Sequence, residues 1–205
     1  EENNFSDEKY NYVSNGHWGN GAIRNYVWGC IHLKDPENNE LQFSRSPQLA
    51  LGIHDFGVRF GFFFGDNILP TDPTFTEVIR DNELLSEILA VVNNNPSLSF
   101  FRKSDENVAG REINLEINTV NDLTNNWEIG IKFFERIEQE NLDDNSFDEI
   151  LNTLNYLAPI FKKICNKRSS NNIVQGETMD IVPEVISDLF LSEDEFREYL
   201  DLIKS

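Results

Sequence analysis

The part of the sequence that most restricts the fold runs from residue 48 to residue 65. One run rich in aliphatic residues, 48–54, and one rich in aromatic residues, 57–65, are separated only by Asp55 and Phe56. In the second run, Phe60, Phe62 and Phe64 alternate with Gly61, Phe63 and Gly65. One face is therefore aromatic, and the other is nearly bare, which allows a helix or another backbone to approach closely. A period of two is typical of a β-strand with one aromatic face, and so short a connection is typical of a hairpin. The segment therefore predicts two neighbouring antiparallel strands.

Other segments extend this pair into a small sheet. Aromatic and β-branched residues with strand character occur at residues 26–33, 41–43, 97–103, 111–117 and 127–133. Between them, Thr74 and Glu77 match a capping box that opens a helix reaching about Val92. Residues 1–22 end in a Gly-rich stretch, which predicts a loop. We expect an α+β domain over residues 1–140, in which an antiparallel sheet meander packs against this helix.

The last third of the chain is predicted to be helical. Ser146 and Glu149 form a second capping box, followed by apolar residues at a period of 3.6. Pro159 is expected to kink this helix, which occupies residues 141–168. Residues 169–205 begin with a polar linker and end in two short predicted helices.

Acidic residues greatly outnumber basic ones. The 36 aspartates and glutamates against 17 lysines and arginines give a net charge of −19. Most non-specific affinity for nucleic acid comes from cations that displace counterions from phosphates, so the overall charge disfavours nucleic-acid binding. Because physiological salt screens charges beyond about 8 to 10 Å, a small basic face can still act locally.

Several classes of protein are disfavoured by what the sequence lacks. No stretch is long and apolar enough to span a bilayer, and Cys30 and Cys165 suggest neither a disulfide framework nor a zinc site. Nucleophile-elbow, zinc-protease, dinucleotide and phosphate-loop motifs are missing, and the three histidines are widely spread. We expect a cytoplasmic segment without enzymatic activity, catalytic residues, metal, cofactor or membrane partner. The first residues are Glu1 and Glu2 rather than Met, so we expect a piece of a longer protein.

The end of the chain resembles a known junction. Residues 188–205, DLFLSEDEFREYLDLIKS, are similar to the helical lead-in that runs into the first strand and phosphate-binding loop of McrB-type AAA+ GTPases. The predicted helix ending near residue 168 resembles the kinked helix that often precedes this junction. Residues 41–66, which include FSRSPQL and GVRFGF, are similar to an N-terminal region attached to some members.

This resemblance implies the N-terminal targeting domain of a modification-dependent restriction system for phage defence. Such domains recognise double-stranded DNA, often with a modified base, while a ring-forming motor and a partner nuclease cut it. The motor would follow residue 205, so the GTP and Mg²⁺ that it uses belong to the missing part, and the isolated segment is expected to be monomeric. Because these N-terminal domains differ in fold, the resemblance implies no fold for residues 1–140.

Recognition of duplex DNA requires cations that hold phosphates and a rigid element or aromatic pocket that reads a base. The candidate cations lie beside the predicted strands and the loop at 104–110: Arg24, Lys34, Arg45, Arg59, Arg102, Lys103 and Arg111. The alternative for each is a solvated surface cation. Trp18, in a Gly-rich loop, either stacks on an extruded base or folds back onto the core.

Two functions are consistent with these features. The first is a DNA-recognition module of a McrB-like system, which predicts duplex binding that weakens steeply with salt. The second is a protein-interaction or sensor domain of a defence AAA+ protein that uses its acidic surface and does not bind DNA. The resemblance favours the first and the net charge favours the second; we rank DNA recognition ahead.

Overall fold

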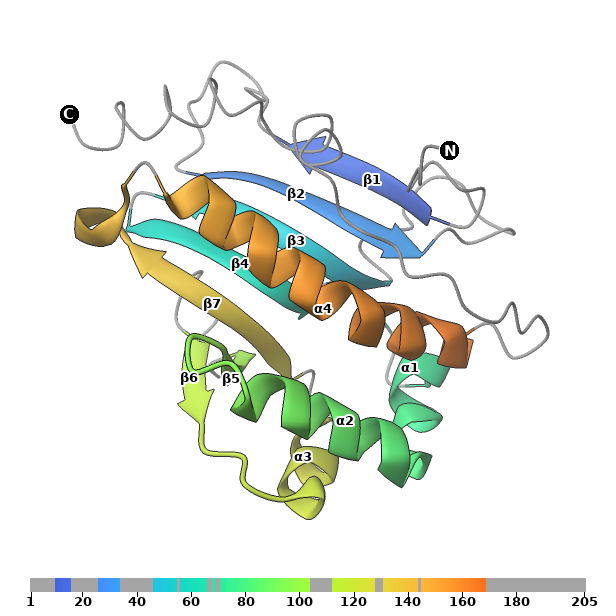
Figure 1. The fold of residues 1–205 in the computed structure, drawn as a ribbon. Coiled ribbons are helices and arrows are strands. Elements are labelled where there is room, and N and C mark those ends of the chain that lie inside the picture. Colours follow the sequence, from blue (N-terminus) through green and yellow to red (C-terminus); the bar gives the residue numbers. More distant parts are fainter. Residues whose placement is uncertain are drawn as a thin grey trace.

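The computed structural model describes residues 10–15, 26–33, 46–54, 56–65, 68, 71–103, 112–127, 131–143 and 145–168. Within these residues the fold is α+β, with one antiparallel sheet and a layer of helices on one of its faces (Figure 1). The longest helix crosses the middle of the sheet, and the shorter ones lie beside its lower end in this view.

The described part of the sheet has seven strands. They are β1 (Tyr10–Asn15), β2 (Tyr26–Leu33), β3 (Pro47–His54), β4 (Gly57–Phe64), β5 (Ser99–Lys103), β6 (Glu112–Leu115) and β7 (Lys132–Glu138). Their order is β1-β2-β3-β4-β7-β5-β6, and every neighbouring pair is antiparallel. The first four strands form a meander. The chain then returns through β5 and β6 before β7 inserts between β4 and β5.

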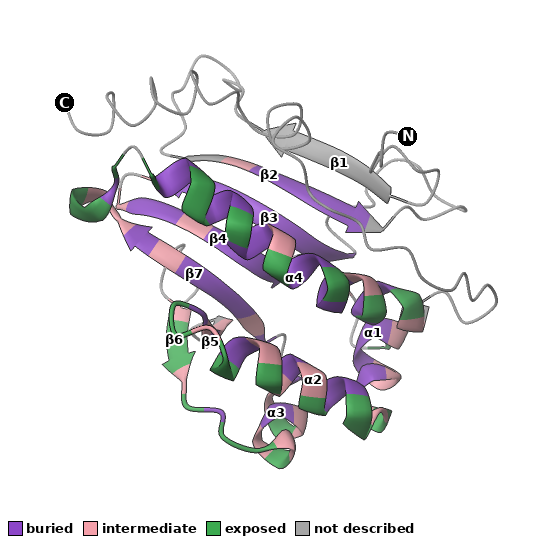
Figure 2. Ribbon diagram, viewed as in Figure 1, coloured by how far each residue is buried: buried purple, intermediate pink, exposed green. Residues whose placement is uncertain are grey.

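The helices cover one face of this sheet. They are α1 (Pro73–Thr76), the 3₁₀ turn η2 (Val78–Arg80), α2 (Asn82–Asn93), α3 (Val120–Trp127), the 3₁₀ turn η3 (Gln139–Asn141) and α4 (Ser146–Arg168). Helix α4 packs on β3, β4, α1 and α2. Its sheet-facing side is buried and its outer side is exposed, as expected for an amphipathic helix (Figure 2).

Aromatic rings fill the space between sheet and helices. Phe62 on β4 stacks on Phe133 of β7, with ring centroids 4.6 Å apart. It also meets Trp127 of α3 and Phe161 of α4, with centroids 6.3 and 6.5 Å away. The Trp127 indole N–H donates to the carbonyl of Thr74 (3.0 Å), so this buried polar group is satisfied. The aromatic face predicted from the alternation in β4 is thus the main core.

Two features of the predicted hairpin are confirmed. Strands β3 and β4 pair directly, with His54 opposite Gly57, and β3 begins at Pro47, where the absent N–H costs no ladder bond. Gly61 has φ +150°, and a Cβ there would lie 2.6 Å from the Phe134 Cα of β7. The expectation that a backbone approaches the small side of β4 therefore holds. The strand predicted at 41–43 lies outside the described residues.

The prediction of one continuous helix from Thr74 to Val92 is wrong. The chain forms α1, η2 and α2 in succession, and each of the two α-helices has its own aspartate cap. Asp72 accepts the Thr74 backbone N–H and Asp81 accepts that of Leu84, both at 2.9 Å. Aspartate competes well for exposed helix-start N–H groups, so Asp81 begins a new helix inside the predicted one.

The alternation predicted as a strand from Trp127 to Phe133 is also wrong at its start. Trp127 ends helix α3, and β7 begins at Lys132. Thr119 and Asp122 begin α3 reciprocally, because the Thr119 hydroxyl accepts the Asp122 backbone N–H (3.1 Å) and the Asp122 carboxylate accepts that of Thr119 (3.0 Å). The Thr119–Asp122 capping pattern is visible in the sequence, but the alternation of apolar residues from Trp127 to Phe133 favoured a strand.

Two further differences concern the ends of the described chain. The predicted loop over residues 1–22 contains strand β1, which pairs with β2 from Tyr10 to Asn15. Helix α4 begins at Ser146, five residues after the predicted start at 141, and ends at Arg168 as predicted; Ser146 bonds back to Asp143 rather than closing a capping box with Glu149. Pro159 lies on the exposed side of α4, and the helix continues past it to Arg168. None of the described helices combines the length and apolar character that crossing a membrane requires.

Candidate nucleic-acid interface

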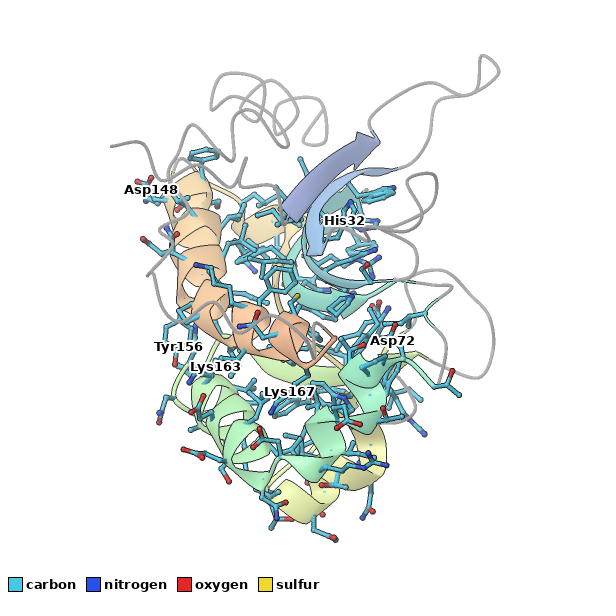
Figure 3. The ribbon with its side chains drawn as sticks, turned by 90° about the vertical axis from the view of Figure 1, so that its right-hand side faces the viewer. His32, Asp72, Asp148, Tyr156, Lys163 and Lys167 are labelled. Carbon is cyan, nitrogen blue, oxygen red and sulfur yellow. The ribbon has the colours of Figure 1, made fainter. Side chains whose placement is uncertain are left out.

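The face of the sheet that points away from the helices, here called the second face, differs in chemistry from the core face. Alternation along β2 and β3 places His32 and Gln48 there, opposite each other in register. Figure 3 shows His32 on the side of the sheet away from α4. Both side chains are nevertheless buried, with 1% and 9% of their surface exposed.

A short row of aromatic rings lies on the second face. Phe134 of β7 is sandwiched between Phe101 of β5 and Phe63 of β4, with ring centroids 4.1 and 5.0 Å away and nearly parallel planes. Cys30 and Ala50 join these rings in a small apolar cluster separate from the main core. Burial raises the pKa of the Cys30 thiol to about 12. The rings give this face a rigid floor.

Four charged side chains gather beside the aromatic row, and we call them the cationic cluster: Arg59, Lys132, Arg136 and Glu112. The Arg59 guanidinium donates to the Glu112 carboxylate at 2.5 Å. Lys132 Nζ and Arg136 Nη2 lie 3.9 and 3.8 Å from the same carboxylate. Three cations thus share one buried carboxylate. The exposed fractions of the three cationic side chains are 22%, 16% and 30%.

The β5–β6 hairpin must leave the plane of the sheet to make these contacts. Phe101 of β5 pairs with Lys132, and Glu112 pairs with Lys103, two residues further along β5. A flat hairpin would therefore place Glu112 about 20 Å from Arg136 along the strand direction, given a rise of roughly 3.3 Å per residue. Because the two charges are in contact, the hairpin turns back over the second face. Glu112 reaches the cluster only through this curvature.

Hydrogen bonding in the cluster is incomplete. Within the part of the chain that the structure describes, Glu112 Oε2 and Arg136 Nε are buried without a hydrogen-bond partner. Arg136 also lies 3.7 Å from Glu138, whose side chain is 45% exposed. Both contacts of the Arg136 guanidinium are longer than a hydrogen bond, so they are electrostatic only.

Aromatic faces provide further stabilisation for the cations. The Arg59 guanidinium and Lys132 Nζ each lie 5.7 Å from the centre of the Phe63 ring, and the Arg136 guanidinium lies 4.8 Å from that of Phe56. The His54 ring stacks on the Phe56 ring, with the two centroids 4.6 Å apart. Burial, with the positive charges of Arg59 and Arg136, lowers the pKa of His54 to about 4. The imidazole is therefore neutral at physiological pH and adds no charge.

The structure locates only some of the predicted DNA contacts. Arg59 is in the cationic cluster. Arg102 leaves β5 on the opposite side from Phe101 and lies opposite Ile113, so it is not part of the cluster; its Nε is buried without a hydrogen-bond partner among the described residues. Lys103 is the last residue of β5, but its side chain is not described. The other candidates lie outside the described residues: Trp18, Arg24, Lys34, Arg45 and Arg111.

Sequence reasoning missed Lys132 and Arg136. Both alternate with Phe133 and Glu135 along β7, so they emerge on the second face beside Arg59 of β4. The signal is the order Lys132, Phe134, Arg136, which places two cations and one aromatic ring on the same side of a strand. This order identifies a cationic face only if the strand begins at Lys132, whereas the predicted strand ended at Phe133.

Cations on the helix layer also pair with carboxylates. Lys163 Nζ lies 2.5 Å from the Glu87 carboxylate of α2, and Lys167 pairs with Asp81. Tyr156 of α4 donates its hydroxyl to the Val91 carbonyl at 3.0 Å. Figure 3 shows Tyr156, Lys163 and Lys167 along the edge of α4 that faces α2. These contacts bind the two helices together.

One acidic pair lies between the sheet and α4. The Thr153 hydroxyl donates to the Glu135 carboxylate at 2.8 Å, and Glu135 is only 4% exposed. Burial and the neighbouring Glu149 raise the pKa of Glu135 to about 7. The described residues contain no group of three or more His, Cys, Asp or Glu side chains placed to hold a metal ion.

Comparison of the sequence with models of protein families and with curated proteins gave no match.

Proposed function

We propose that this chain is the DNA-recognition module of a McrB-like restriction system and that it binds duplex DNA, with or without a modified base, through its second face. The observation that supports this most directly is the cationic cluster. Arg59, Lys132 and Arg136 lie together around the Glu112 carboxylate on the second face, in a chain with a net charge of −19. Such a concentration of positive charge is suited to phosphate.

The overall negative charge and local phosphate binding are compatible over short distances. Charges more than about 8 to 10 Å from the bound phosphate are largely screened at physiological salt. The three cations lie within that distance of one another, whereas the acidic helix layer is separated from them by the thickness of the sheet. The long-range repulsion slows encounter with DNA but leaves the contact itself favourable.

The proposal also covers the motor and the nuclease with which this chain would act. The segment itself has no enzymatic activity or cofactor and directs a GTP- and Mg²⁺-dependent motor and a partner nuclease to DNA in the cytoplasm. It is monomeric when isolated. A match of the encoded residues after Ser205 to a phosphate-binding loop would support this part independently of DNA binding.

Duplex binding over a salt series tests the proposal. Labelled duplexes, either unmodified or modified at cytosine or adenine, are titrated with the chain while fluorescence anisotropy is recorded. We expect the logarithm of the affinity to fall linearly with the logarithm of the salt concentration. Lys132→Gln and Arg136→Gln should each weaken binding to all sequences and reduce the magnitude of the salt slope by about one.

Lys163→Gln is the matched control, because it removes one positive charge from the helix layer, where Lys163 is paired with Glu87. It should leave the slope unchanged. Circular dichroism and thermal unfolding establish that the variants are folded. Absence of duplex binding at about 50 mM salt, or equal losses in all three variants, would contradict the proposal.

One observation favours a second function. Among the described residues, the exposed acidic side chains are Glu83, Glu116, Glu140, Asp143, Asp148 and Glu149, whereas the exposed cationic ones are Arg80 and Lys163. This surface is suited to a basic protein partner. The corresponding test is a pull-down with a polylysine-rich protein as probe, in which binding that Asp148→Lys abolishes and Arg136→Gln leaves intact would favour the sensor function.

A further inference from the structure

We infer that Arg102 binds a backbone phosphate of duplex DNA from the outer side of the β5–β6 hairpin. The outer side is the one that carries Arg102 and Ile113, which lie opposite each other in register. This inference rests on the proposed function and adds to it a contact outside the cationic cluster. The ligand is a phosphate diester, and the surface that meets it is the hairpin rather than the middle of the sheet.

The two sides of the hairpin have different surroundings. Successive residues of a strand point to opposite sides, so Glu112 and Ile113 face in opposite directions. Glu112 lies in the cationic cluster, where the Arg59 guanidinium donates to it at 2.5 Å. Because the hairpin turns back over the second face, the side opposite Glu112 faces away from the sheet. A duplex that approaches the second face therefore meets Arg102 and Ile113 on the outside of the molecule.

The outer side also lies beyond the edge of the main core. Phe100 and Leu115 are opposite each other in register; Phe100 is buried in the main core and Leu115 packs against it. The next pair on the same side of the hairpin is Arg102 with Ile113. Ile113 is 39% exposed, and no residue of β6 is fully buried (Figure 2). The hairpin thus extends past the packed layers, where a large partner can reach it.

Arg102 differs from the other arginines whose side chains the structure describes. Arg59 and Arg80 donate to carboxylates at 2.5 and 2.8 Å, and the Arg136 guanidinium lies 3.7 Å from the carboxylate of Glu138. Arg102 has no ion pair or hydrogen bond in the described part of the chain, and its Nε is buried. A charge that is partly removed from water without a partner is costly. An anion that pairs with Arg102 therefore gains more than one that must first break an existing ion pair.

The chemistry of the Arg102–Ile113 pair is suited to a phosphate. Arginine keeps its charge at any physiological pH and offers parallel N–H donors that match the spacing of phosphate oxygens. Directly opposed side chains of antiparallel strands have Cβ atoms about 5 Å apart, so Ile113 borders the Arg102 side chain. An apolar neighbour lowers the local dielectric, which strengthens charge-assisted hydrogen bonds. The Glu112 contact holds the hairpin in place beforehand, so less conformational entropy is lost on binding.

The decisive variant is Arg102→Gln, with Arg80→Gln as its matched control. Both remove one positive charge, but Arg80 is paired with Glu77 in the helix layer. In anisotropy titrations, Arg102→Gln should bind duplexes of every sequence about tenfold more weakly, with a salt slope smaller by about 0.9. Arg80→Gln should leave affinity and slope nearly unchanged. Equal effects of the two variants would overturn the inference, and so would a loss confined to particular sequences, which indicates a base contact.

Arg102→Lys separates the charge from the shape of the guanidinium. Lysine keeps the charge but cannot form two parallel hydrogen bonds to one phosphate. We expect the salt slope of the original chain and an affinity between those of the original chain and Arg102→Gln. A slope reduced as in Arg102→Gln would show that the effect does not come from the charge at this position, and it would overturn the inference.

Modification of the original chain with phenylglyoxal needs no substitution, so it also covers the case that Arg102→Gln does not fold. Mass spectrometry of peptides follows each arginine separately. Arg102 should react faster than the ion-paired Arg59 and Arg136, and bound duplex should slow its reaction. Protection of Arg59 and Arg136 without protection of Arg102 would leave DNA recognition standing and reject this inference. Absence of any duplex binding at about 50 mM salt would reject the proposed function and this inference together.

Discussion

The two faces of the sheet bury different kinds of side chain. The core face packs aromatic rings against four helices, and the buried indole N–H of Trp127 there has a hydrogen-bond partner. The second face combines a small apolar cluster with three cations and the carboxylates of Glu112 and Glu138, and some of its buried polar atoms have no hydrogen bond among the described residues. The difference indicates that the core face is held by apolar packing, whereas the second face also depends on contacts between charged side chains.

The largest expected difference between the two faces is in stability, and it is tested by removing one phenylalanine from each face of β4. Phe62→Ala removes a ring that contacts three strands or helices and should lower the free energy of unfolding by about 3 to 5 kcal/mol. Phe63→Ala, on the second face, should cost about half as much, because its ring meets Phe134 and two cations and is 8% exposed. Denaturant titration measures both; equal losses would mean that the second face is a full core.

A smaller effect is expected where the backbone of β4 meets β7. Gly61→Ala would place a Cβ 2.6 Å from the Phe134 Cα at a φ of +150°, so the two strands must separate. We expect a loss of about 2 kcal/mol. Gly52→Ala is the control, since its nearest contact is the far end of the His54 side chain at 2.9 Å, which can move. A Gly61→Ala protein as stable as Gly52→Ala would show that β4 and β7 do not pair as described.

The core face contains one buried carboxyl group, Glu135, so its stability should depend on pH. Because burial raises its pKa to about 7 from an ordinary 4.5, folding favours its protonated form. Its stabilising contribution is complete below pH 4.5 and is lost as the pH rises through about 7. The original chain should therefore lose stability relative to Glu135→Gln over this range, on the order of 1 kcal/mol.

The titration of His54, on the second face, changes stability with pH in the opposite direction to that of Glu135. The measurement is therefore the difference in unfolding free energy between the original chain and Glu135→Gln at each pH. The pKa of His54 falls from 6.5 to about 4, which removes stability as the pH drops between those values. Asp148→Asn is the control for Glu135→Gln, because Asp148 is exposed at the start of α4. If Glu135→Gln and Asp148→Asn gave the same pH profile, the carboxyl pair with Glu149 would not be formed.

The smallest effect is expected on the helix layer. Lys163→Ala removes an ion pair with Glu87 whose two side chains are 54% and 38% exposed. Such a pair contributes less than about 1 kcal/mol and is screened by salt. A double-mutant cycle with Glu87→Ala at low and high salt measures it. A coupling energy larger than that of Arg59 with Glu112 would reverse our ranking of the two charged regions.

The sequence predicted those parts of the fold that depend on local alternation. Strands β2, β3 and β4, their hairpin and the extent of α4 follow from patterns of period 2 or 3.6, so the α+β class was predictable. Where two local signals competed, the apolar pattern misled. Asp81 divided a predicted helix, and Trp127 entered a helix although the residues after it alternate.

The candidate site was only partly predictable, because it depends on curvature between distant segments. Arg59 could be singled out as a strand cation. Its grouping with Lys132 and Arg136 requires β7 to lie beside β4, although more than 60 residues separate these strands in the chain. The role of Glu112 requires in addition that an outer hairpin turns back over the sheet. No local pattern in a single sequence contains that information.

The two cysteines provide built-in reporters of how the layers come apart. Cys30 belongs to the apolar cluster of the second face and Cys165 to the main core under α4, and both are fully buried free thiols. A thiol reagent can therefore modify each one only after its own layer has opened. Mass spectrometry of alkylation rates would then distinguish loosening of the second face from detachment of the long helix, without any label being introduced.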